Sequence, residues 1–257
     1  MKRCIDINCD LGESYGAFSV GNDEKVMLHI TSANIACGFH AGDPETMTET
    51  VSLTKKYGVA VGAHPGYPDL LGFGRREMNL TEEEVRSYTL YQISALQGFA
   101  KAANLKLQHV KPHGALYNTA VKNETTAKAI AEAAKTVSRD MIIFAPPKSA
   151  LAKSAVAAGL RVAFEFFADR NYDADGNLVS RKQKDAVIQE PRRVVERVVD
   201  AVREGKVLDV DGRVFKLGIV HTVCVHGDTP NAPRMVGNLK KGLVEKGIEV
   251  KPVGSFI

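Results

Sequence analysis

The heptapeptide Cys4-Ile5-Asp6-Ile7-Asn8-Cys9-Asp10 alternates strictly in character, with Asp6, Asn8 and Asp10 on one face and Ile5, Ile7 and Cys9 on the other. A period of two predicts a β-strand. The run continues into Leu-Gly-Glu at 11–13, so its polar side chains gather where the strand meets a glycine. Strands that carry polar residues at their carboxyl ends are how α/β proteins assemble an active site from distant parts of a chain.

The same arrangement recurs four more times. In each case an apolar run leads to a histidine within two residues of a glycine, in residues 33–40, 59–64, 108–114 and 223–228. Helical patterns separate these runs, and strands that alternate with helices pair in parallel. Polar strand ends occur in early, middle and late units, whereas an open sheet usually concentrates them at one switch point. We therefore predict one closed α/β barrel, a (β/α) barrel of seven or eight strands, as a single domain over residues 1–257.

Local signals set the expected elements. Asp43-Pro44 caps a helix that closes at Gly58, and Thr81 to Glu84 is a capping box. We expect strands at 4–10, 33–37, 59–64, 107–111, 141–145, 161–167, 219–225 and 248–253, and helices at about 44–57, 81–104, 115–137, 149–158, 191–205 and 231–246. Turn signals at 173–177 and 209–212 predict two hairpins outside the repeat.

Composition excludes several classes of protein. The chain has 257 residues, 44% hydrophobic and 25% charged, and a net charge of +4 with Lys and Arg interleaved among Asp and Glu. No basic run is flanked by aromatic residues, so we expect no nucleic-acid binding, and no apolar stretch is long enough to span a membrane. The four cysteines are isolated, and a strand already begins at residue 4, which leaves no room for a signal peptide. We expect reduced thiols and a cytoplasmic protein.

The polar face of the first run is the first candidate site. A parallel barrel buries both faces of a strand, so Asp6, Asn8 and Asp10 need partners, whereas a solvated strand face would need none. Clustered carboxylates raise one another's pKa, which suits proton transfer. Glu13, just past Gly12, extends the cluster.

Two histidines follow the next strands. His40 lies between Gly38 and Gly42, and glycines allow a ligand to approach the backbone closely. His64 repeats this arrangement at the end of the following run. A single histidine at a strand end is often structural, but two at equivalent ends favour function.

His109-Val110-Lys111-Pro112-His113-Gly114 is the strongest single stretch. Its spacing places His109, Lys111 and His113 on one face of an extended segment. A buried lysine needs an anion or a carboxylate nearby, and we expect its pKa to fall readily. The alternative is a solvated lysine at a surface strand end.

Later motifs add acids, an arginine and a histidine. Glu165 lies among aromatic residues, and the following Asp169-Arg170 pair is either a clamp for a substrate carboxylate or a structural contact. His226 faces the site if Asp228 or Thr229 caps the next helix. Residues 72–76, Gly-Phe-Gly-Arg-Arg, are typical of a mobile anion-binding loop more than of a packing element. No phosphate-binding loop, dinucleotide fingerprint, His-Glu-x-x-His helix or Gly-x-Ser-x-Gly elbow is present.

Seven collinear motifs, spanning nearly the whole chain, together resemble the LamB/YcsF family, with no clear departure from the family pattern. They are residues 6–13 (Asp-Ile-Asn-Cys-Asp-Leu-Gly-Glu), 34–43 (Asn-Ile-Ala-Cys-Gly-Phe-His-Ala-Gly-Asp), 62–69 (Gly-Ala-His-Pro-Gly-Tyr-Pro-Asp), 72–76, 110–117 (Val-Lys-Pro-His-Gly-Ala-Leu-Tyr), 165–170 (Glu-Phe-Phe-Ala-Asp-Arg) and 225–228 (Val-His-Gly-Asp).

The resemblance implies an irregular seven-stranded (β/α) barrel akin to the glycoside hydrolase/deacetylase group. It also implies ATP-dependent opening of 5-oxo-L-proline to L-glutamate together with partner subunits B and C. ATP would be a co-substrate handled with those partners, in agreement with the missing phosphate loop.

For that reaction we expect Asp10, or its neighbour Asp6, to deprotonate water, and His64 or His113 to protonate the departing nitrogen. Lys111 would offset negative charge on phosphate or oxyanion. The expected substrate-binding residues are Asn8, Glu13, His40, Arg75, Glu165, Arg170 and His226, with Arg170 or Arg75 holding the substrate carboxylate. No metal ligand is assigned in this scheme.

Two other functions stay open from the residues. Asp10 with His64 and His113, or with His40, would suit a metal-dependent carbohydrate or amide deacetylase. The second is a non-catalytic, regulatory chain that only binds the lactam, because a fold alone does not assign a reaction.

Overall fold

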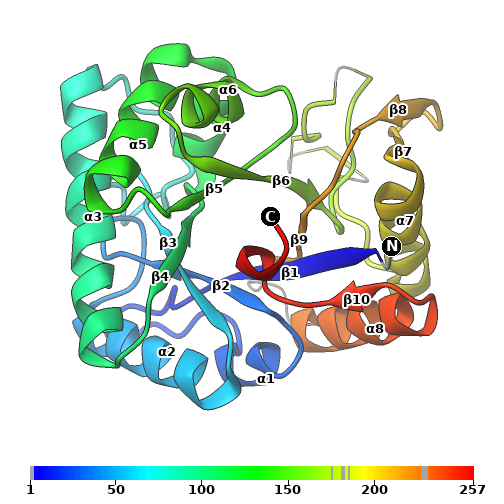
Figure 1. Ribbon diagram of the computed structural model, residues 1–257, viewed down its shortest axis with the longest axis horizontal. Helices are drawn as coiled ribbons and strands as arrows, with labels where there is room; N and C mark the ends of the chain where they lie inside the picture. Colours follow the sequence, from blue (N-terminus) through cyan, green and yellow to red (C-terminus); the bar gives the residue numbers. More distant parts are fainter. Residues whose placement is uncertain (1–2, 175, 181–182, 185, 227–230) are drawn as a thin grey trace.

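Seven parallel strands form a closed barrel in the computed structural model, which describes residues 3–174, 176–180, 183–184, 186–226 and 231–257 (Figure 1). β9 pairs with both β6 and β1 and so closes the ring. The strands in barrel order are β1 (Cys4–Leu11), β2 (Ser32–Ala36), β3 (Ala60–His64), β4 (Leu107–Val110), β5 (Ile142–Ala145), β6 (Arg161–Phe167) and β9 (Thr222–Cys224). The seven-stranded prediction is confirmed.

The C-terminal segment closes the amino end of the barrel. β10 (Glu249–Val250) pairs with the first residues of β1, and the short 3₁₀ helix η1 (Val253–Ser255) follows. Val253 is fully buried against Ile142, Phe144 and Ala163. The predicted strand at 248–253 is therefore wrong in extent, because the chain turns inward at Pro252 to fill the barrel (Figure 1).

Helices cover the outside of the barrel, and their caps explain most of their limits. They are α1 (Asp23–Met27), α2 (Pro44–Tyr57), α3 (Glu82–Ala102), α4 (Gly114–Lys122), α5 (Glu124–Val137), α6 (Ala150–Ala157), α7 (Pro191–Glu204) and α8 (Ala232–Glu245). Asp43 accepts a hydrogen bond from the backbone N–H of Thr46, and both bonds of the Thr81–Glu84 capping box are present. These helix starts are confirmed.

One expectation about helices was wrong, and one helix was missed. The predicted helix at 115–137 is two helices, because the Asn123 side chain accepts from the backbone N–H of Thr126 and starts α5 anew. The short α1 had not been predicted, since it has no side-chain cap and only five residues. The hairpin at 209–212 is confirmed as the antiparallel pair β7 (Lys206–Leu208) and β8 (Val214–Lys216). An isolated antiparallel bridge between Tyr172 and Leu178 flanks the predicted turn at 173–177, of which residue 175 lies outside the described residues.

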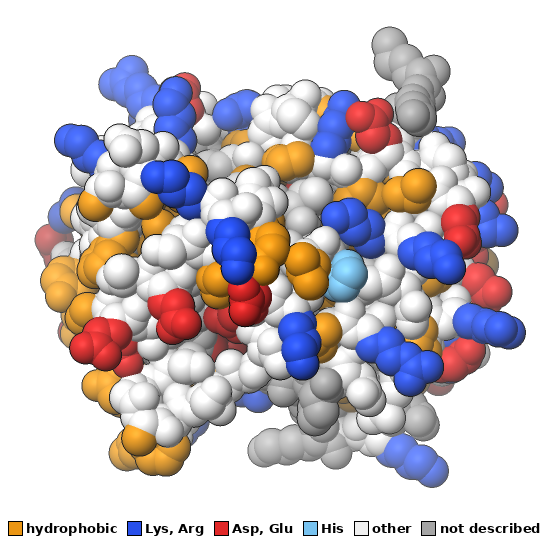
Figure 2. Space-filling view, turned by 90° about the horizontal axis from the view of Figure 1, so that it is seen from below, with side chains coloured by type: hydrophobic (Ala, Val, Ile, Leu, Met, Phe, Trp, Pro, Cys, Tyr) orange, Lys and Arg blue, Asp and Glu red, His pale blue; other side chains and the backbone are white. Residues whose placement is uncertain are grey.

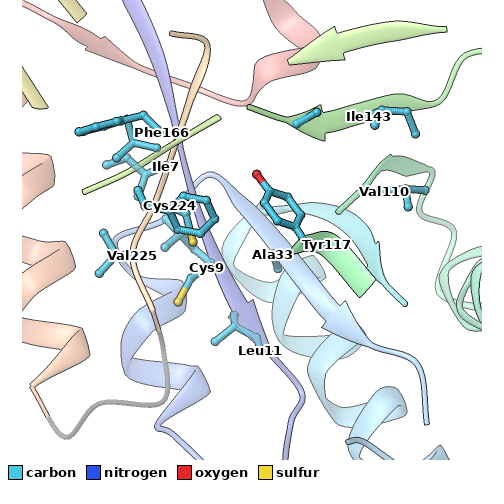
Figure 3. Close-up of a cluster of buried hydrophobic side chains, with 14 of the residues drawn as sticks. Ile7, Cys9, Leu11, Ala33, Val110, Tyr117, Ile143, Phe166, Cys224 and Val225 are labelled. Carbon is cyan, nitrogen blue, oxygen red and sulfur yellow. The ribbon is translucent and has the colours of Figure 1, made fainter. Parts of the chain in front are cut away.

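The alternation of β1 separates the apolar core from a polar barrel interior. Ile5, Ile7, Cys9 and Leu11 are at most 1% exposed and belong to the main apolar cluster, part of which Figure 3 shows along β1. The intervening polar residues face inward, where side chains of all seven strands meet. The site described below lies at the carboxyl end of this interior.

Surface and cysteine properties agree with the composition. On the face in Figure 2, basic side chains are spread over the surface among apolar and acidic ones. Within the described ranges, no helix is both long and apolar enough to cross a bilayer. No disulfide joins the four cysteines, all of which lie within the described residues.

Candidate active site at the carboxyl end of the barrel

The polar residues of β1 lie at different depths. Asp6 is fully buried and accepts hydrogen bonds from the hydroxyls of Thr31, Ser32 and Thr222. Burial raises its pKa to about 6 despite these bonds, and the nearby Glu165 adds to the rise. Asp6 therefore joins β1 to its neighbours deep in the barrel. It lies four residues before Asp10 on β1, deeper in the barrel, and its role as an alternative base stays a prediction.

Lys111 is the centre of the buried polar network. Its ammonium lies 2.8 Å from Asp10 Oδ1, 3.3 Å from Glu165 Oε1, 3.3 Å from Asn8 Oδ1 and 3.0 Å from Cys224 Sγ, with only 2% of the side chain exposed. Burial lowers its pKa, but Asp10, Cys224 and Glu165 together outweigh burial and hold the pKa well above the usual value. The predicted carboxylate contact is confirmed, and the predicted fall in pKa is wrong. Lys111 is thus a fixed positive charge.

Asp10 connects Lys111 to the histidines. Its Oδ1 accepts from Lys111 and from Asn34 Nδ2, each at 2.8 Å, and its Oδ2 lies 3.5 Å from His64 Nε2. Burial raises the pKa of this carboxyl, yet His64 and Lys111 lower it more, so the pKa lies well below the ordinary value. Asp10 is ionised at neutral pH and is a weak base.

His109 lies below the mouth rather than in it. Its Nε2 lies 2.8 Å from Asn34 Oδ1, and its ring stacks on Phe144 with centroids 4.0 Å apart. Burial lowers its pKa to about 3, so the ring is neutral. Gly62 makes room for this ring, since a Cβ there would lie 1.9 Å from His109 Nε2. His109 shares a face with Lys111, as predicted, but acts in packing.

Four side chains from four separate segments meet at the mouth. Glu13, His40, His64 and His113 are all buried, and one ligand-type atom from each lies within 4.8 Å of the others. His113 Nδ1 is 2.9 Å from His64 Nε2 and 3.4 Å from Glu13 Oε1, and His40 Nε2 is 3.3 Å from Glu13 Oε1. Burial and neighbouring histidines lower the pKa of both His40 and His113 well below the ordinary value. The sequence-based prediction that these residues converge is confirmed.

The loop at residues 72–76 packs on this cluster. The Phe73 carbonyl lies 2.9 Å from His113 Nε2, and a Cβ on Gly74 would meet His40 and His113 at 2.7 and 2.8 Å. Arg76 pairs with Asp69, while Arg75 is exposed and lies over the Phe73 ring. The loop thus packs on the histidines, while its mobility and anion binding by Arg75 stay predictions.

A second histidine site involves β6 and β9. His226 Nδ1 lies 2.9 Å from Asp169 Oδ1, and its ring stacks on Phe167. Burial raises the pKa of Asp169, but the contact with His226 lowers it below the ordinary value. An ionised carboxylate only accepts hydrogen bonds, so His226 carries its proton on Nδ1 and presents Nε2. Asp169 as a positioning partner was missed, because nothing in the sequence links residues 57 positions apart. The predicted helix cap at Asp228 or Thr229 lies outside the described residues.

Glu165 and Arg170 differ in how they relate to the network. Glu165 joins it, since Oε1 accepts from Asn8 Nδ2 at 3.1 Å and Oε2 accepts from the Tyr117 hydroxyl at 2.7 Å. Tyr117, carried by α4, was not predicted as a site residue. Arg170 donates to the carbonyls of Val179 and Ala186. A structural contact was one of its two expected roles, and its role as a carboxylate clamp stays a prediction.

A closed (β/α) barrel with a buried lysine–carboxylate network and histidines at its carboxyl mouth has the architecture of an enzyme of the barrel class. The chain belongs to the LamB/YcsF family, whose pattern it matches over residues 5–257. It is 51% identical over 253 residues to the A subunit of 5-oxoprolinase from Pyrococcus abyssi, covering 98% of this chain and 99% of that protein. The corresponding protein of Thermococcus onnurineus is 52% identical with the same coverage.

A solved structure agrees with the fold. The lactam utilization protein from Thermus thermophilus superimposes with a TM-score of 0.91 at 45% identity, covering 96% of this chain and 99% of that one. The relatives thus match the barrel from end to end.

Proposed function

We propose that this chain is the A subunit of an ATP-dependent 5-oxoprolinase, which opens 5-oxo-L-proline to L-glutamate together with subunits B and C. The observation that carries this proposal is identity of about one half along nearly the whole length of proteins with that name. The site is compatible with it, because several proton-transfer groups and a fixed positive charge lie at one mouth. We place the reaction in the cytoplasm, where ATP is available.

The chemistry needs an activated amide. Transfer of the γ-phosphoryl group from ATP to the lactam oxygen makes the carbonyl carbon electrophilic. Water then adds to that carbon, and the ring C–N bond breaks as the nitrogen takes up a proton, which leaves an acyl phosphate. A second water hydrolyses this acyl phosphate to the carboxylate of L-glutamate and phosphate. We assign ATP to a site shared with the partner subunits.

The geometry suggests how proton transfer is divided. Asp10 is bound to Lys111 and held at low pKa, so it suits electrostatic positioning better than the removal of a proton. His226, oriented by Asp169, has the arrangement of a general base or acid. We therefore assign proton transfer at the lactam to His226, and place Lys111 beneath the site as a positive charge that steadies developing negative charge.

The test is glutamate formation from 5-oxoproline and ATP, first with this chain alone and then with subunits B and C. We expect turnover only in the complete mixture. Lactam binding without turnover in the complete mixture would instead favour a non-catalytic binding role. Activity of the chain alone on an acetylated sugar or amide, without ATP, would favour the deacetylase.

Variants test the assigned roles in the same assay. His226→Gln should lower kcat by about 10²- to 10⁴-fold, the usual contribution of general acid–base catalysis. His29→Gln is the matched control, because the His29 ring lies beside Gly237 of α8 and outside the site, and it should leave kcat unchanged. Near-normal glutamate formation by both Asp10→Asn and Lys111→Met would defeat the assignment of the buried network.

A further inference from the structure

The histidines at the mouth have defined tautomers. His64 Nδ1 lies 2.6 Å from the backbone carbonyl of Lys111, and His113 Nε2 lies 2.9 Å from the carbonyl of Phe73. A carbonyl oxygen only accepts hydrogen bonds, so the ring nitrogen that faces it must carry the hydrogen. In the neutral form each ring has only that one N–H, so its other nitrogen, His64 Nε2 or His113 Nδ1, carries a lone pair and no hydrogen.

These two bare nitrogens face each other at 2.9 Å. With both rings neutral, neither nitrogen can donate to the other, and two lone pairs meet at hydrogen-bond distance in a buried place. Such a contact is stable only when a positive species lies between the nitrogens. Backbone carbonyls behind ligating histidines are also the usual means of orienting them toward a metal ion.

Glu13 supplies a third donor. Its Oε1 is 3.4 Å from His113 Nδ1. Ligands about 2.1 Å from one metal ion, at tetrahedral or octahedral angles, lie about 3.0–3.4 Å apart. The observed separation of 3.4 Å lies at the upper end of that range, and that of 2.9 Å lies 0.1 Å below its lower end. Asp10 Oδ2, 3.5 Å from His64 Nε2, lies close enough to complete the set.

His40 has a different role at the mouth of the barrel. Its ring is parallel to that of His113, with an interplanar angle of 3° and centroids 3.8 Å apart. Two stacked rings cannot direct their in-plane lone pairs at one point. Its Nε2 instead lies 3.3 Å from Glu13 Oε1, where an N–H would hold the carboxylate in place. His40 is thus a positioning residue for Glu13.

We propose that His64 Nε2, His113 Nδ1 and Glu13 Oε1, with Asp10 alongside, bind one divalent transition-metal cation such as Zn²⁺. Imidazole and carboxylate ligands suit that class of cation, whereas Mg²⁺ and Ca²⁺ prefer all-oxygen sites. The cation would lie at the mouth of the barrel, where it can polarise a carbonyl or a bound water. The proposal does not depend on the lactam reaction.

Direct binding tests this site without any substrate. The chain is stripped with chelator, and Zn²⁺ is titrated by calorimetry, with Co²⁺ as a visible-absorption probe of the ligands. We expect one equivalent to bind with a dissociation constant of micromolar or below. His113→Ala and His64→Ala should weaken binding at least 100-fold, and His40→Ala about 10- to 100-fold. Glu13→Gln, which keeps the side-chain shape, serves if a histidine variant does not fold.

His29→Ala is the matched control and should bind as the unaltered chain does. Failure of the unaltered chain to bind Zn²⁺ or Co²⁺ at millimolar concentration would overturn the proposal and leave a shared proton between the two rings. Binding that persists in His113→Ala, His64→Ala and Glu13→Gln alike would overturn it too, because the metal would then sit elsewhere. Neither result bears on glutamate formation, so the two proposals fail independently.

Discussion

Replacing Lys111 by Met should destabilise the protein strongly. The ammonium lies 2.8 Å from Asp10 and 3.3 Å from Glu165 in a nearly fully buried site. At an effective dielectric constant of about 20 these contacts correspond to about 6 and 5 kcal/mol before desolvation, which removes several kcal/mol per ion. Met keeps much of the volume but leaves two buried carboxylates without their cation. We expect the free energy of unfolding to fall by about 3–5 kcal/mol, the usual result of breaking a buried pair.

Urea unfolding at pH 7.5, monitored by circular dichroism, measures this loss. Lys56→Met is the matched control, because Lys56 pairs with Glu24 on the surface and should leave stability nearly unchanged. The pKa of Asp10 is lowered in the folded protein, so its pairing stabilises above the unfolded pKa and is lost as pH falls through the folded value. The difference between Lys111→Met and the unaltered chain should therefore shrink in acid. A loss below about 1 kcal/mol at pH 7.5 would refute a network that depends on this charge.

Three further outcomes follow from the geometry. Gly62→Ala places a Cβ 1.9 Å from His109 Nε2 and should lower the free energy of unfolding by at least about 3 kcal/mol. Gly98 lies on the exposed face of α3, where an added Cβ would meet nothing within 4 Å, so Gly98→Ala should raise the free energy of unfolding by about 0.5–1 kcal/mol. Thermal unfolding of both variants measures these changes. The pKa of Asp6 is raised to about 6, so its ionisation lowers the stability of the folded protein as pH rises from about 4 to 6. The free energy of unfolding of Asp6→Asn, relative to that of the unaltered chain, should therefore rise by about 3 kcal/mol over that window. A difference that stays constant with pH would contradict this. Asp169→Asn should lower kcat in the reconstituted oxoprolinase assay about as much as loss of its histidine partner; unchanged kcat would rule out the pair as the proton-transfer group.

Local pattern was enough to predict the barrel and the end at which its site lies. The alternation in β1 and the glycines after the strand runs depend only on neighbouring residues. The helix caps at Asp43 and Thr81 are equally local and were confirmed. Where a local signal was overlooked, as at Asn123, the helix limits were wrong.

Depth and protonation depended on the tertiary structure. Asp6 and Asp10 have the same character in the sequence, and only the strand register places one among hydroxyls and the other beside Lys111. The rise in the pKa of Lys111 comes from carboxylates on β1 and β6, which are remote in the chain. The tautomers of His64 and His113 are set by the backbone carbonyls of Lys111 and Phe73, which folding places next to the two rings. Residue identity and local periodicity can be read from the sequence. Electrostatic fields and hydrogen-bond partners arise only when folding brings distant strands into contact.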